Sequence, residues 1–132
     1  MLRMPLLAVL VAAALAGCTA APSGPVAATV TVAGLNPADS TRITASGTVT
    51  GIAENDGRCI FTFWASSGAA TRLSGPGKAA GDHVACGPVD EEVGFLVGGT
   101  YSVELKYQPV AGDPVTSERY PMTLPTPSDL NP

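Results

Sequence analysis

Residues 101–107, Tyr-Ser-Val-Glu-Leu-Lys-Tyr, contain the pattern that decides the fold. Large apolar or aromatic side chains occupy every second position, and polar or charged ones lie between them. Because successive side chains of a β-strand point to opposite faces, this alternation predicts a strand with one buried and one exposed face. Gly98-Gly99 before the stretch and Gly-Asp-Pro at residues 112–114 after it mark its limits.

The same strand pattern recurs on both sides of this stretch. Further strands are expected at Val26–Ala33, Arg42–Ile52, Cys59–Ala65, Thr71–Ser74, His83–Val89 and Val115–Leu124. No segment carries apolar residues at a sustained helical period, and glycine or proline interrupts most windows. About seven short strands at regular spacing predict an all-β chain folded as an antiparallel β-sandwich.

Glycine and proline predict how these strands are connected. We expect a hairpin loop at residues 54–57, Glu-Asn-Asp-Gly, and a turn at residues 75–77, Gly-Pro-Gly. Gly87-Pro88 predicts an edge or a bulge in its strand. Gly47 falls on the apolar face of its strand, where the missing side chain lets another backbone or a bulky ring approach closely.

The first 17 residues predict a targeting segment. Arg3 is their one charge, and the apolar run Leu6–Ala16 has the length of a signal-peptide core, well short of the roughly 20 residues of a membrane-spanning helix. The run ends in Leu-Ala-Gly-Cys at residues 15–18, which resembles the bacterial lipobox. This resemblance implies that Cys18 becomes the mature N-terminus and carries diacylglycerol, so that lipid anchors the protein in the membrane.

An ordinary secretory signal, cut near Ala14 or Ala20, is the alternative and leaves Cys18 without a role. The lipobox interpretation places the protein on the extracytoplasmic face of the cell membrane. The chain then divides into a lipoprotein signal peptide (1–17), a tether of small residues and proline (18–25), the β-sandwich domain (26–124) and a polar, disordered tail (125–132).

Cys59 and Cys86 are an even pair once Cys18 is assigned to lipid. In an exported chain such a pair persists as a disulfide. Closing a loop of about 28 residues contributes roughly 3.5 kcal/mol through the entropy of the unfolded chain. A metal site that adds His83 lacks a fourth ligand of obvious spacing, and a redox pair would usually show Cys-x-x-Cys. We therefore expect a structural disulfide.

Two segments carry a family resemblance. Residues 99–105, Gly-Thr-Tyr-Ser-Val-Glu-Leu, look like the penultimate-strand entry of fibronectin-III-like and immunoglobulin-like (Ig-like) domains. Residues 46–51, with Cys59 opening a strand and Cys86 before Gly-Pro, are similar to Ig-like domains of secreted proteins from high-GC Gram-positive bacteria. The resemblance implies an Ig-like sandwich in which Tyr101 can form a tyrosine corner. Antibody-type domains join their second and sixth strands by disulfide, whereas Cys59 falls on the third strand here.

Composition and charge exclude several functions. The net charge is -4 and charged residues make up 14% of the chain, which argues against a nucleic-acid binder with a basic patch. His83 is the one histidine, so a cupredoxin-type copper site, which needs two, is excluded. A hydrolase centred on His83 would lack the Gly-x-Ser-x-Gly elbow.

Two acidic groups, residues 90–92 and Glu54 with Asp56, could supply carboxylates. Glycoside hydrolysis needs two of them at a fixed separation in a cleft, which domains of this class seldom provide. Calcium takes oxygen ligands, but the spacing Asp-x-Asp-x-Asp-Gly is missing. We expect both groups to keep loops solvated, and we expect no catalysis, no metal and no cofactor.

Trp64 is the candidate binding residue. On the strand at residues 59–65 it falls opposite Phe61 and Phe63, alongside Ile60. If the phenylalanines face the core, Trp64 stands on the outer face, where its ring can stack on a sugar or a peptide. If Trp64 is instead the core tryptophan that Ig-like domains bury on their third strand, the phenylalanines face a covering loop. The Ig-like resemblance favours burial.

Three functions remain open. The favoured one is a lipid-anchored cell-envelope protein whose non-catalytic Ig-like domain binds an envelope protein or a glycan. The alternatives are a small ligand-carrying or enzymatic lipoprotein and a structural scaffold of the envelope. A concave pocket with converging polar groups would favour the ligand carrier or enzyme, and an exposed apolar patch would favour the binding domain.

Overall fold

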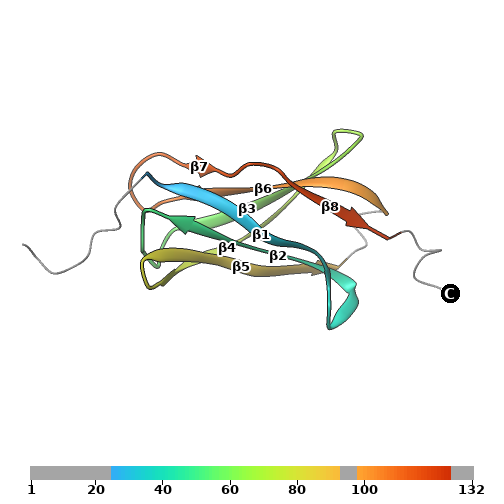
Figure 1. Ribbon diagram of the computed structural model, residues 1–132, viewed down its shortest axis with the longest axis horizontal. Coiled ribbons are helices and arrows are strands. Elements are labelled where there is room, and N and C mark those ends of the chain that lie inside the picture. Colours follow the sequence, from blue (N-terminus) through green and yellow to red (C-terminus); the bar gives the residue numbers. More distant parts are fainter. Residues whose placement is uncertain (1–24, 93–97, 126–132) are drawn as a thin grey trace, which may run out of the picture.

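The computed structural model describes residues 25–92 and 98–125, which form an all-β structure (Figure 1). The strands are β1 (Ala27–Asn36), β2 (Asp39–Thr50), β3 (Arg58–Ala65), β4 (Ala70–Ala80), β5 (His83–Glu92), β6 (Gly99–Gln108), β7 (Val115–Thr116) and β8 (Tyr120–Leu124). Every pairing between them is antiparallel. The predicted all-β, antiparallel fold class is therefore confirmed. The predicted signal peptide, Cys18 and nearly all of the predicted tether and tail lie outside the described residues.

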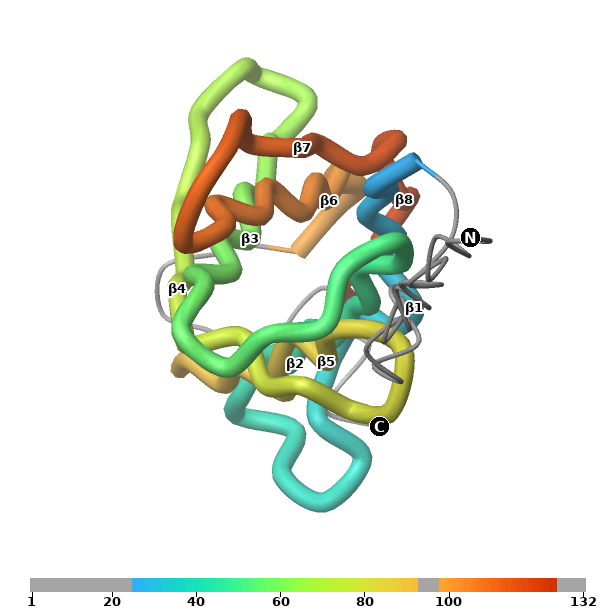
Figure 2. The backbone as a smooth tube through the Cα atoms, turned by 90° about the vertical axis from the view of Figure 1, so that its left-hand side faces the viewer, coloured from blue at the N-terminus to red at the C-terminus, as the bar shows by residue number. Residues whose placement is uncertain are grey.

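The strands form two layers that pack face to face (Figure 2). We call them sheet A, with β1, β2, β5 and the end of β4, and sheet B, with the start of β4, β3, β6, β7 and β8. Strand β4 belongs to both, and Figure 2 shows it running along one side between the layers. The result is a sandwich whose layers share a strand.

The core lies between the two sheets and follows the predicted alternation. Strand β6 buries Tyr101, Val103, Leu105 and Tyr107, and the other buried apolar residues include Ile43, Ala45, Val49, Phe61, Phe63, Val84, Met122 and Leu124. A Cβ at Gly47 would lie 2.6 Å from both Leu105 Cδ2 and the Thr29 carbonyl oxygen. The predicted close approach at Gly47 is therefore confirmed.

The segment 75–77, Gly-Pro-Gly, is not the turn that we predicted. Strand β4 continues through it, pairing with β3 up to Pro76 and with β5 from Gly77 onward. A Cβ at Gly77 would lie 2.8 Å from Val84 Cγ1 and 3.0 Å from Tyr107 Cε2. Glycine is needed here because the strand crosses tightly over the core, not because the chain reverses.

The segment 54–57 is not a hairpin loop either, because β2 and β3 lie in different sheets. It connects the sheets and is fastened by Glu54. The Tyr107 hydroxyl donates to Glu54 Oε1 (2.6 Å), and the Val110 amide donates to the same oxygen (3.0 Å). Burial and this hydrogen bond raise the pKa of Tyr107 above its ordinary value. Gly57 lies directly against the Tyr107 ring, so a side chain there would clash with it.

Gly87-Pro88 marks both an edge and a bulge, as predicted. Strand β5 pairs with β4 only as far as Cys86. On its other side, the register with β2 shifts between Ala45 and Gly47. Gly87 itself has φ = 80°, a conformation that favours glycine.

The predicted disulfide between Cys59 and Cys86 is present. It joins β3 of sheet B to β5 of sheet A, and the two Cα atoms are 5.8 Å apart. Cys59 pairs with Gly75 and Cys86 with Gly77, so the disulfide lies at the point where β4 passes between the sheets. It joins the third and fifth strands, unlike the second and sixth strands of antibody-type domains.

Candidate functional site

Trp64 lies on the outer face of sheet B, so the core placement favoured by the resemblance is wrong. Phe61 and Phe63 on the same strand have no exposed surface and face sheet A. Because side chains alternate along a strand, Trp64 must point to the opposite face. The second sheet, and not a loop, covers the phenylalanines, and the core is complete without the tryptophan.

The surroundings of Trp64 come from three adjacent strands, with β3 between β4 and β6. In register across the sheet stand the rows Ala70–Trp64–Ser102, Arg72–Thr62–Glu104 and Ser74–Ile60–Lys106. Trp64 therefore has small neighbours on both sides, while charged side chains flank Thr62. We call the outer surface formed by Ile60, Thr62, Trp64, Arg72, Glu104, Lys106 and Arg119 the Trp64 face.

Arg119 reaches this face from the irregular segment between β7 and β8. Its guanidinium carbon lies 4.3 Å from the centroid of the Trp64 ring, a cation–π contact. Its Nε lies 3.9 Å from Glu104 Oε2. The half-buried Trp64 ring is therefore covered in part by a cation that is itself more than half exposed.

Two hollows border Trp64. One of about 360 Å³ has Thr62 and Ile60 among its lining residues, with Arg72, Glu104 and Lys106 around them. The other, of about 500 Å³, lies toward the β3–β4 connection and is lined in part by Trp64, Ser102 and Arg119. Both hollows are open to solvent and not enclosed, so a ligand there would lie along the surface.

Charge is distributed unevenly over the described residues. Four of their six arginines and lysines stand on the outer side of sheet B, with Glu104 on β6 and Asp56 in a hollow next to Arg58; the four are Arg58, Arg72, Lys106 and Arg119. The rest of the described chain carries Arg42 and Lys78 against eight carboxylates. An acidic domain thus has one basic face, and the tryptophan lies on it.

Sequence reasoning found Trp64 but missed the cations around it. The alternation in residues 101–107 places Lys106 on the outer face, so its signal was available. Arg72 stands on a strand that we predicted only in part. Arg119 lies in an irregular segment, where no periodicity indicates the direction of a side chain.

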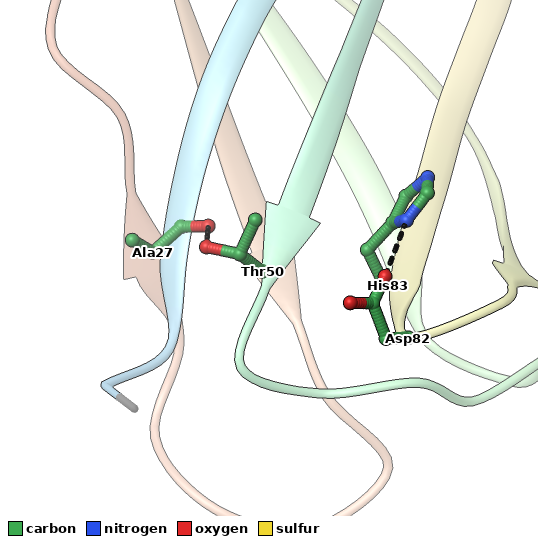
Figure 3. A network of polar contacts seen from close by, with 4 residues as sticks. All are labelled: Ala27, Thr50, Asp82 and His83. Carbon is green, nitrogen blue, oxygen red and sulfur yellow. Dashed lines mark hydrogen bonds and ion pairs between the residues drawn. The ribbon is translucent and has the colours of Figure 1, made fainter. Parts of the chain in front are cut away.

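His83, the first residue of β5, makes a local contact with the turn that precedes it (Figure 3). Its Nδ1 lies 3.2 Å from Oδ1 of the neighbouring Asp82, and this hydrogen bond lowers the pKa of Asp82. The Thr50 hydroxyl, drawn in the same view, donates to the Ala27 carbonyl oxygen (3.4 Å) and not to His83. The geometry of this pair is that of an exposed turn.

The acidic run at residues 90–92 lies in β5 and not in a loop, which corrects our expectation. Strand β2 provides its partner, with Arg42 opposite Glu92. Asp90 Oδ1 accepts a hydrogen bond from Asn36 Nδ2 (3.1 Å). In residues 25–92 and 98–125 no three His, Cys, Asp or Glu side chains are grouped so that they could hold a metal ion.

Comparison of the chain with protein-family models, with curated proteins and with solved structures finds no match. Within the described ranges, no helix is long and apolar enough to cross a membrane. The fold and the site define the class instead: a disulfide-linked, all-β sandwich with an aromatic and cationic outer face.

Proposed function

We propose that this protein is a lipid-anchored, non-catalytic binding module of the cell envelope, and that it binds its partner through the Trp64 face. The observation that carries the proposal is the position of Trp64, a large aromatic side chain on the outer face of a sandwich whose core does not need it. Tryptophan and arginine are the residue types most enriched among binding hot spots, and Trp64 and Arg119 stand together.

The sequence around Cys18 supports the anchor. Cys59 and Cys86 are used in the disulfide, which leaves Cys18 as the remaining thiol of the chain. The first described residues enter β1 at one end of the sandwich, and the β3–β4 connection that follows Trp64 lies at the other end (Figure 1). A lipid at Cys18 would therefore leave the Trp64 end of the domain directed away from the membrane.

Trp64→Ala should weaken binding to isolated cell-envelope fragments by about 30-fold or more, since a hot-spot truncation costs 2 kcal/mol or more. Sedimentation of the fragments with the purified full chain measures the affinity. Val32→Ala, on the outer face of sheet A, is the matched control because Val32 is 53% exposed, and this change should leave binding intact. Equal binding by wild type and Trp64→Ala would contradict the proposed surface.

Cys18→Ser should release the protein from the membrane fraction, as an unprocessed or shed form, because the lipid has no other attachment point. Fractionation of cells that express wild type and variant measures this, with Thr19→Ser as a control that keeps the cysteine. An intact mass for the mature protein that begins beyond residue 18 without a lipid would disprove the anchor.

A further inference from the structure

We propose that the ligand of the Trp64 face is an acidic carbohydrate, a chain of sugar rings that bear carboxylate or phosphate groups. This inference rests on the proposed binding function and names the chemical class that the face would take.

The Trp64 face carries more positive than negative charge. Arg72 and Lys106 stand on opposite sides of the hollow over Thr62, and Arg119 lies over the Trp64 ring. The three cations face one carboxylate, Glu104, while the rest of the domain is strongly acidic. An anionic ligand is therefore attracted to this face and repelled by the others.

The position of β3 inside sheet B argues against an extended peptide. A peptide that adds a strand needs a free sheet edge, because main-chain hydrogen bonds supply its affinity. Strand β3 has β4 on one side and β6 on the other over its whole length, including Trp64. A ligand over β3 therefore meets side chains and is recognised by stacking and by charge, while the edge that β4 leaves unpaired at residues 70–76 lies one strand away.

The combination of groups selects a ring that carries a negative charge. Arg119 stacks over the Trp64 indole, with its guanidinium carbon 4.3 Å from the ring centroid, and the partly exposed indole leaves some apolar surface that the guanidinium does not cover. The pair therefore offers a planar donor and an apolar contact side by side. Arginine binds carboxylate and phosphate through paired hydrogen bonds. Acidic sugars present both an apolar ring face and an anionic group, and the hollows along Trp64 leave room for neighbouring rings.

Glu104 competes with the ligand for the Arg119 guanidinium. Its carboxylate lies 3.9 Å from Arg119 Nε, and the Arg119 side chain is 58% exposed. Exposed ion pairs of this kind are weak, so an anionic group of the ligand can replace Glu104 on the guanidinium. Removal of the Glu104 charge should therefore strengthen binding, an effect that misfolding cannot imitate.

The test uses the fluorescence of Trp64, the one tryptophan of the chain, in the full-length protein in neutral detergent. The probes are oligogalacturonate for carboxylate, phosphomannan for phosphate, dextran as a neutral carbohydrate and polyglutamate as an acidic peptide. Oligogalacturonate or phosphomannan should change the Trp64 emission saturably, with an affinity that falls as salt rises. Dextran and polyglutamate should bind at least about tenfold more weakly.

Substitutions on the Trp64 face and on another surface test whether the ligand binds at this face. Arg72→Gln combined with Lys106→Gln should weaken the acidic carbohydrate about tenfold or more. Lys78→Gln removes a cation from another surface and should change nothing. Glu104→Gln should tighten binding about two- to fivefold, the range of an exposed ion pair.

Each contrary result has a distinct meaning. If dextran binds as tightly as the acidic carbohydrates, charge is not recognised. If polyglutamate binds as tightly as they do, the sugar ring is not recognised. Either result overturns the assignment of an acidic carbohydrate. Failure of both acidic carbohydrates, while Trp64→Ala still abolishes capture of envelope fragments, would overturn the ligand class and leave the binding function standing. If Trp64→Ala captures fragments as wild type does, the binding function itself fails.

Discussion

Phe63→Ala is expected to lower the free energy of unfolding by about 3–5 kcal/mol, because it empties a fully buried position between the two sheets. Trp64→Ala, one residue further along the same strand, should cost about 1 kcal/mol or less, since it removes an outer-face side chain. Urea unfolding of the two variants, followed by far-ultraviolet circular dichroism, measures both values.

The neighbouring positions control for each other, because both changes remove an aromatic ring from β3. The comparison therefore separates burial from strand propensity. A similar loss of stability in both variants would place Trp64 in the core and remove it as a binding residue, while leaving the all-β fold class intact.

Replacement of both disulfide cysteines, Cys59→Ala with Cys86→Ala, should lower the free energy of unfolding by roughly 3.5 kcal/mol. The bond closes a loop of sequence separation 27, which restricts the unfolded chain. For a domain of this size the thermal midpoint should fall by roughly 15–25 °C. Differential scanning calorimetry measures the shift.

Reduction of the wild-type protein supplies the matched control. Dithiothreitol should lower the wild-type midpoint to near that of the double variant and should leave the variant unchanged. A wild-type midpoint that does not respond to reduction under unfolding conditions would show that the disulfide contributes little.

The strands could be predicted because the alternation of apolar and polar residues within each strand identifies it without the rest of the chain. The alternation at residues 101–107 places Tyr101, Val103, Leu105 and Tyr107 inside without reference to the rest of the chain. The cysteine pair was predictable for a related reason, since an even number of cysteines in a chain that we expect to be exported leaves few alternatives to a disulfide. Local pattern and tertiary structure agree at these positions.

The connections could not be predicted because glycine has more than one use. Residues 75–77, Gly-Pro-Gly, have a composition typical of turns. In the structure, however, Gly77 lacks a side chain because β4 passes close to Val84 and Tyr107 there. The contact appears only when the two sheets are packed. The same holds for Gly57, whose partner Tyr107 lies fifty residues away in the chain.

Trp64 shows the limit of family resemblance as a guide to orientation. The Ig-like pattern favoured a buried tryptophan, whereas the alternation with Phe61 and Phe63 allowed either face. Which face is inner depends on where the second sheet lies, and that is decided by β4 and the disulfide rather than by β3 itself.

The sharing of β4 determines how the domain would bear mechanical load. The chain enters through β1 in sheet A, while the Trp64 face belongs to sheet B, so tension between the proposed anchor and a ligand on that face would have to pass from one sheet to the other. Apolar contacts between layers are non-directional and offer little resistance to sliding. The main chain of β4 and the Cys59–Cys86 bond cross between the layers side by side. The two layers therefore have two adjacent covalent links, which should resist the sliding of one sheet over the other.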